Sequence, residues 1–332
     1  MVTPSEPRVE PMVTPSEPRV EQLAALPGQG MEIDPPFMAL PDLPVSWELF
    51  EAVKVGDTAE ALAILRQPDF DGVNAKDKSG CSALHYAASR GLSTVCRTLL
   101  QQASFVEANA TDCFSRTALI HAAQAGQTEA CQVLVTSSRF TGHDTRTIHD
   151  RTALHAAAER GHLGVCRLLL DCSRFRLASE QDNVGQTALH RAAVSGHACV
   201  CGALLDHERF APPNAVDADG WTALHWAASG GHAITCRVLL EHCRFTAANA
   251  RTSRGWTALH YAAAHGQVEV CRLLLQHPHF RAVGMLDCIG RTALDCARDA
   301  GHTTACQVLG QDPRLVSLAS LEDATSAILK QT

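Results

Sequence analysis

Residues 152–170 read TALHAAAERGHLGVCRLLL, and this stretch decides the fold of the chain. Thr152 is an N-cap candidate, and Leu154, Ala157 and Ala158 follow at the i, i+3 and i+4 spacing of one helix face. We therefore predict a first helix over 152–160, ended by Gly161. The apolar run at 165–170 predicts a second helix over 162–170, antiparallel to the first because the glycine turn is short.

The same helix–turn–helix unit returns every 35 residues along most of the 332-residue chain. The repeated positions hold Leu49, Leu84, Leu119, Leu154, Leu189, Leu224, Leu259 and Leu294; Ala52, Ala87, Ala122, Ala157, Ala192, Ala227, Ala262 and Ala297; and Phe70, Phe105, Phe140, Phe175, Phe210, Phe245 and Phe280. Self-similarity at this period is typical of arrays in which each unit buries its apolar face by stacking on its neighbours. The sequence therefore predicts an all-α solenoid whose units are joined by polar, hairpin-like loops.

Cysteine also follows the period, at Cys96, Cys131, Cys166, Cys201, Cys236, Cys271 and Cys306. Packed helices lie about 10 Å apart, which exceeds the roughly 7 Å between Cα atoms that a disulfide tolerates. We therefore expect these cysteines to be reduced packing residues of a cytoplasmic, or alternatively nuclear, protein.

Composition excludes several functional classes. Apolar residues make up 46% of the chain, which is enough for a large core, and the net charge of −7 comes without a cluster of basic residues, so we expect no nucleic-acid partner. No run approaches the roughly 18 consecutive apolar residues of a membrane span. The beginning of the chain lacks the basic and apolar regions of a secretory signal, so we expect a soluble, intracellular protein.

The repeated unit resembles the ankyrin repeat, whose signature Thr-Pro-Leu-His-x-Ala follows a β-turn and opens a pair of helices. The matching segments are TALHAA at 152–157, TALHRA at 187–192, TALHWA at 222–227 and TALHYA at 257–262. The resemblance extends over about residues 46–315. It implies an ankyrin-repeat solenoid with short β-hairpin-like loops, which binds proteins at the hairpin tips and on the concave face of the first helices.

Three features depart from the family pattern. Alanine replaces the signature proline in all seven full units, and each unit is about two residues longer, so we expect a longer loop whose phenylalanine covers the seam between neighbours. Ile120 and Asp295 stand where the signature has histidine. We expect weaker hairpin bonding in those two units.

The chain is predicted to have four parts. Residues 1–45 hold ten of the fifteen prolines and a duplication of residues 1–10 at 12–21, which predicts a disordered tail. Residues 46–80 form an N-terminal capping repeat and residues 81–310 a seven-repeat array. Residues 311–332 are predicted to be a C-terminal cap or tail, with an amphipathic run at 321–329.

Seventeen histidines raise the question of catalysis or metal binding, but most of them recur at repeat positions. A catalytic group acts in one asymmetric constellation, so repetition favours structural roles, and we expect the signature histidines to bond the hairpin backbone. The chain also lacks the usual metal, phosphate-loop and serine-hydrolase motifs. We therefore predict that it is not an enzyme and has no catalytic residue, no metal ligand and no cofactor.

Binding residues are expected at positions where the residue type varies between units, because those side chains are not needed to pack the core. Aromatic side chains and arginines dominate protein interfaces. The candidates before the signature Thr are Trp221, Trp256, Arg116, Arg151 and Arg291; those at the hairpin tips are Phe114, Ile148, His149, Val184 and Arg254; and those on the first helices are Arg90, Glu159, Arg160 and His265.

Two interpretations stay open at this point. Trp221 and Trp256 either form steps of a binding edge or merely pack between neighbouring hairpins. An arginine column after the second helix is either a solvated edge or a stripe for an acidic partner; it consists of Arg139, Arg174, Arg209, Arg244 and Arg314.

The leading functional hypothesis is a monomeric adaptor or scaffold that binds a protein along the concave groove. The first alternative is a regulatory or targeting subunit of an enzyme complex, with the proline-rich tail as a second docking segment. The more distant alternative is a metal-binding or redox protein that uses its cysteines and histidines.

Overall fold

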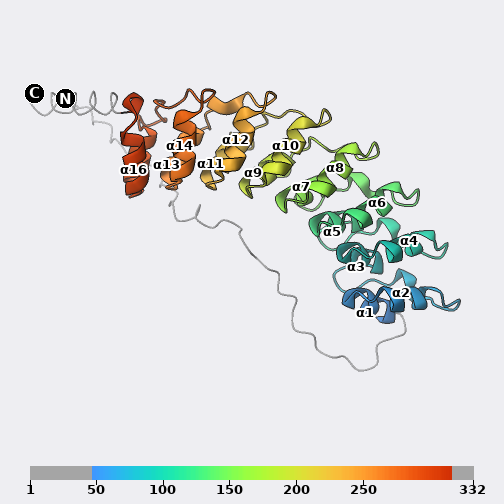
Figure 1. Cartoon of the computed structure of the whole chain (residues 1–332). Coiled ribbons are helices and arrows are strands. Elements are labelled where there is room, and N and C mark those ends of the chain that lie inside the picture. Colours follow the sequence, from blue (N-terminus) through green and yellow to red (C-terminus); the bar gives the residue numbers. More distant parts are fainter. Residues whose placement is uncertain (1–46, 316–332) are drawn as a thin grey trace, which may run out of the picture. The chain divides into compact units, whose positions relative to one another are not determined.

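The computed structural model describes residues 47–315, so the predicted tail at 1–45 and the amphipathic run at 321–329 lie outside the described residues. Residues 47–315 form a row of eight helix pairs (Figure 1). The pairs are α1 (Glu48–Val55) and α2 (Thr58–Leu65), α3 (Ala83–Arg90) and α4 (Ser93–Gln101), α5 (Ala118–Gln124) and α6 (Thr128–Thr136), α7 (Ala153–Glu159) and α8 (Leu163–Asp171), α9 (Ala188–Val194) and α10 (Ala198–Asp206), α11 (Ala223–Ser229) and α12 (Ala233–Glu241), α13 (Ala258–Ala264) and α14 (Val268–Gln276), and α15 (Ala293–Asp299) and α16 (Thr303–Gly310).

These pairs build an all-α solenoid, as predicted. Each first helix packs on the first helices of the neighbouring units, and each second helix packs on the second helices (Figure 1). The hairpin-like loops contain no strand in the described range, and their one isolated bridge joins Lys76 and Ser82. The pair α1 and α2 occupies the predicted capping unit, whose role as a cap stays a prediction.

The repeated residues form the core. All eight leucines and all eight alanines of the repeat are buried. The phenylalanines from Phe105 to Phe280 are buried as well, and Phe70 is partly buried. That they cover the seam between neighbouring units stays a prediction. Burial raises the pKa of Cys96, Cys131, Cys166, Cys236 and Cys271 to about 12, so these free thiols are neutral packing groups.

The signature histidines join neighbouring units. In α7, His155 Nδ1 accepts from the backbone N–H of Thr152 at 3.2 Å, and its Nε2 lies 3.0 Å from the carbonyl oxygen of Gln186 in the next unit. Only the neutral tautomer with its proton on Nε2 satisfies both bonds. His85, His190 and His260 make the same two bonds, which confirms their predicted structural role.

The two units without this histidine differ from each other. In the Ile120 unit, the hydroxyl oxygen of Thr117 is buried and has no hydrogen-bond partner, as weaker bonding there requires. In the other unit, Asp295 takes over the capping, because its Oδ2 accepts from the backbone N–H of Thr292 at 2.9 Å. A carboxylate at this position therefore supplies the local capping bond, and the weaker bonding to a neighbouring hairpin stays a prediction.

Each first helix is followed by a glycine with a positive φ, and in the second full unit that glycine is required for two reasons. Gly126 has a φ of 75°, a left-handed conformation that favours glycine. A Cβ added to Gly126 would also lie 2.5 Å from Nδ1 of His162 in the next unit. That histidine packs there because its Nε2 lies 3.1 Å from the carbonyl oxygen of Gln124.

The arginine column joins the units on the side of the second helices. Arg209 Nη1 donates to the carbonyl oxygens of Leu170 at 2.6 Å and Cys172 at 2.7 Å, at the end of the preceding unit's α8. Arg244 does the same for Leu205 and His207. The last carbonyls of a helix lack intrahelical partners, and these guanidinium groups satisfy them. Neither sequence interpretation anticipated this clamp, which also includes Arg139, Arg174 and Arg314.

Candidate protein-binding face

Most hairpin loops are held by one aspartate that the sequence analysis missed, and Thr147 and Thr252 take its place in two of them. Asp112 Oδ1 accepts from the backbone N–H groups of Phe114 at 2.9 Å and Arg116 at 2.8 Å. Asp182, Asp217 and Asp287 cap their loops in the same way. This local bonding orients the tip residues of each loop. The signal in the sequence is the aspartate that recurs at multiples of 35 residues.

The second oxygen of the same aspartate connects the loop to the first helix. Asp217 Oδ2 accepts from Nε1 of Trp226 at 2.9 Å, and Asp112 Oδ2 lies 2.9 Å from Nε2 of His121. In both cases the partner lies nine residues further along the chain. The aspartate at one loop position therefore binds different side chains of the first helix in different units.

Three positions recur where neighbouring units meet, and we call each such set a junction. The first member of a junction is the residue before the signature Thr or Ser of one unit, and the second is the hairpin Asp or Thr of the next unit. The third member is the residue directly after the position of the signature histidine in that next unit. The six junctions are Cys81/Asp112/His121, Arg116/Thr147/Ala156, Arg151/Asp182/Arg191, Gln186/Asp217/Trp226, Trp221/Thr252/Tyr261 and Trp256/Asp287/Cys296.

The third junction is a charged network. Arg191 is buried and forms an ion pair with Asp182, and Arg151 Nε lies 3.8 Å from the same carboxylate. Glu159 pairs with Arg151 at 3.2 Å and with Arg191 at 3.9 Å. Burial alone would raise the pKa of Asp182, but its hydrogen bonds and the charge of Arg191 lower it below its usual range.

Two other predicted arginines are also paired within the chain. Arg116 Nε lies 2.7 Å from Asp112, and Arg291 Nε lies 3.1 Å from Asp287. The exposed fractions of these side chains are 22% and 36%. A partner would therefore meet arginines that are already oriented by carboxylates and only partly free for new bonds.

The fifth junction is aromatic. The ring centroid of Trp221 lies 3.9 Å from that of Tyr261 and 4.4 Å from that of Trp226. Trp256 lies 4.8 Å from Tyr261, and its Nε1 donates to Asp287 Oδ2 at 3.1 Å. The tryptophans therefore pack between neighbouring units, but all three remain partly exposed. Packing and partner binding remain compatible roles for them.

The predicted tip residues lie on the surface. Phe114, Ile148 and Val184 are 41%, 53% and 44% exposed, and His149 and Arg254 are exposed beside them in their own loops. The same set of loops exposes four apolar residues that the sequence analysis did not name: Val216, Met285, Leu286 and Ile289. Ile289 occupies the same repeat position as Phe114 and Val184, and Val216 and Leu286 share another repeat position.

The remaining candidates lie at the ends of first helices. Arg90 ends α3, Arg160 and His265 are the residues just after α7 and α13, and all three are exposed. Glu159 is half-buried because it belongs to the charged junction. These residues therefore occupy equivalent places in different units and do not gather into one site.

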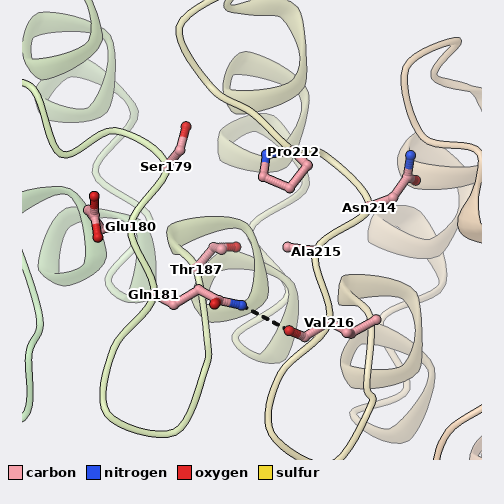
Figure 2. Close-up of a pocket in the computed structure, with 8 residues that line it drawn as sticks. All are labelled: Ser179, Glu180, Gln181, Thr187, Pro212, Asn214, Ala215 and Val216. Carbon is pink, nitrogen blue, oxygen red and sulfur yellow. Dashed lines mark hydrogen bonds between the residues drawn. The ribbon is translucent and has the colours of Figure 1, made fainter.

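A pocket of about 520 Å³ lies between two loops of neighbouring units (Figure 2). Figure 2 shows Gln181 reaching toward Val216, whose carbonyl oxygen accepts from its Nε2 at 2.9 Å. The lining residues are Ser179, Glu180, Gln181, Thr187, Pro212, Asn214, Ala215 and Val216. The carboxylate of Glu180 is already paired with Arg146 at 2.6 Å, and none of the predicted binding residues lines the pocket.

One group of side chains in the described range 47–315 has the geometry to hold a metal ion. The ligand atoms of Cys81, Asp112 and His121, which form the first junction, lie within 4.8 Å of one another. The sequence analysis expected no metal ligands because the three residues belong to no local motif.

Comparison with known families agrees with this architecture. The family model for ankyrin repeats (3 copies) matches residues 49–145, 138–212, 204–284 and 245–316. The chain therefore belongs to the ankyrin repeat family, whose members generally mediate protein–protein interactions and are typically non-catalytic. A search of curated proteins finds no match. Among residues 47–315, no helix has the length and apolarity that a membrane crossing needs.

Proposed function

We propose that this ankyrin-repeat chain is a monomeric, non-catalytic adaptor or scaffold that binds a protein partner along its hairpin tips and first helices. One observation carries the proposal: seven of the ten large apolar side chains exposed in the described range lie on the hairpin loops. Exposed apolar residues that gather on one edge mark interaction surfaces. The fifth and sixth junctions add the partly exposed Trp221 and Trp256 to that edge.

The rigid frame beneath the loops supports the same proposal. The loop aspartates and the signature histidines hold the tips before a partner arrives, so little ordering entropy is lost on binding. The partly free edges of Arg116, Arg151 and Arg291 supply charge next to the apolar tips. His149, Arg254, Arg90, Glu159, Arg160 and His265 extend the proposed contact surface. A reducing compartment, the cytoplasm or the nucleus, fits the fourteen cysteines, which are all free.

Affinity capture with matched variants tests the proposal. The variant Phe114→Ser/Ile148→Ser/Val184→Ser removes apolar tips, and the control Val106→Ser/Ile234→Ser removes two side chains that are 71% and 74% exposed outside the hairpin tips. A partner captured by the wild type and by the control, but lost with the tip variant, supports the proposal. Equal retention by the tip variant contradicts it.

A second variant examines the aromatic junction. Trp221→Ala/Trp256→Ala is expected to weaken binding of the same partner and to leave the helical circular dichroism nearly unchanged, because both side chains are partly exposed. Loss of the helical signal would assign the two tryptophans to folding alone. If the captured protein is an enzyme and is lost only when residues 1–45 are removed, the chain acts instead as a regulatory or targeting subunit.

A further inference from the structure

The second full unit departs from its neighbours by one position. It reads Leu119-Ile120-His121, whereas the standard units have histidine directly after the leucine. The shift leaves the buried hydroxyl oxygen of Thr117 without a partner. A break in the repeat that leaves a buried polar atom unsatisfied is expected at functional sites.

The shift moves the imidazole into the first junction. His121 Nε2 lies 2.9 Å from Asp112 Oδ2, and the thiol of Cys81 from the preceding unit completes a group whose ligand atoms lie within 4.8 Å of one another. Cys81 and Asp112 are buried, and the side chain of His121 is 16% exposed, so one edge of the group is open to solvent.

No other junction combines these residue types. At the position of Cys81 the other junctions have Arg116, Arg151, Gln186, Trp221 and Trp256, and at the position of His121 they have Ala156, Arg191, Trp226, Tyr261 and Cys296. The repeat therefore does not require Cys81 or His121 for packing.

We propose that Cys81, Asp112 and His121 form a binding site for Zn²⁺ between the first two full units. Thiolate, imidazole and carboxylate are the three side-chain ligands that zinc takes in proteins. Three protein ligands leave a fourth position of a tetrahedral ion for water or for a side chain of a bound protein.

The surroundings of the three residues suit this role. Arg116 Nε and two backbone N–H groups bond Asp112, which fixes the orientation of the carboxylate as outer partners of metal ligands do. On binding, Zn²⁺ replaces the hydrogen bond between His121 and Asp112. The imidazole gives up its Nε2 proton to solvent and stays neutral with a proton on Nδ1, and the Cys81 thiol releases its proton to solvent as the zinc–sulfur bond forms. Arg116 keeps its bond to the carboxylate, which has lone pairs for both partners.

Cobalt(II) titration of the purified full chain tests the site, because thiolate-bound cobalt has a charge-transfer band in the near ultraviolet. We expect one equivalent of Co²⁺ to produce that band and Zn²⁺ to abolish it by displacement. Cys81→Arg and His121→Ala reproduce the residues of the next junction, Arg116 and Ala156, so the repeat already accommodates both. Each is expected to lower the Zn²⁺ affinity by at least about tenfold.

Cys113→Ser is the matched control, because Cys113 is exposed and lies next to Asp112 in the sequence. The cobalt band should survive in Cys113→Ser and disappear in Cys81→Arg, with unchanged helical circular dichroism in both. A wild-type chain that gives no band overturns the proposal. A band that persists in Cys81→Arg, or that disappears in Cys113→Ser, overturns it as well.

Discussion

The charged junction of Arg151, Asp182 and Arg191 and the aromatic junction of Trp221, Thr252 and Tyr261 occupy equivalent positions two units apart. In the first, two guanidinium groups share a buried carboxylate; in the second, aromatic rings lie 3.9 Å apart. The leucines and alanines beneath both are buried to the same degree. The comparison shows that the repeated leucines and alanines stabilise the same backbone in every unit. The residue types at the junctions can therefore differ from one unit to the next.

The largest expected effect comes from removing the buried carboxylate of the charged junction. Asp182→Ala leaves Arg191, whose side chain is 9% exposed, without its main partner, so we expect a loss of about 3 to 5 kcal/mol in unfolding free energy. Asp217→Ala removes equivalent backbone hydrogen bonds but leaves only the neutral indole of Trp226 without its partner. We therefore expect a loss of about 1 to 3 kcal/mol in unfolding free energy. Urea unfolding measures both, and equal losses would show that the ion pair adds nothing.

Substitution of the shared core should affect both regions alike. Leu189→Ala and Leu259→Ala each empty a position that is at most 1% exposed, so each should cost about 2 to 5 kcal/mol by leaving a cavity. The loss should spread to adjoining units, because each unit is stable only against its neighbours. Hydrogen exchange and urea unfolding check this. A change below about 0.5 kcal/mol in either variant would contradict a common frame.

Acid should weaken both regions through the signature histidines. Burial lowers the pKa of His155 beside the charged junction and of His225 beside the aromatic one to about 4. Between about pH 6.5 and pH 4 the unfolded chain binds more protons than the folded chain, so stability falls as the pH falls through that window. Each histidine contributes on the order of 1 kcal/mol per pH unit.

Unfolding free energies at several pH values, for the wild type and for His225→Gln, measure this dependence. The variant should lose part of the slope between pH 6.5 and pH 4. The carboxylate of Asp182, whose pKa is lowered, adds its own loss only as the pH falls below the ordinary aspartate value of 3.8. An unchanged slope in His225→Gln would show that this histidine is not neutral in the folded chain.

The repeat architecture could be predicted because it depends on residues that recur at one spacing. Leucine, alanine and phenylalanine at multiples of 35 residues indicate stacked helix pairs, and the solenoid has them in its core. The capping of α15 by Asp295 was not foreseen, because helix capping depends on an acceptor atom, which aspartate supplies as well as histidine.

For the candidate binding residues, the sequence predicted where they lie but not which groups they contact. Phe114, Ile148 and Val184 were expected at the tips and are exposed there. The bonds of Arg116 to Asp112, and of the clamp residue Arg209 to the carbonyl oxygens of the unit before it, were not foreseen. A sequence reveals that an arginine is present but not which acceptors come within its reach.

The sequence by itself determined the unit, its period and the side chains that fill its core, because apolar burial follows spacing along one chain. Only the tertiary structure decided which residues meet across two units: that the arginine column caps helices, that Trp221 packs against Tyr261, and that Cys81 faces Asp112 and His121. The physical reason is distance. These groups are separated by about one repeat along the chain, and only the stacking of neighbouring units brings their atoms within bonding range.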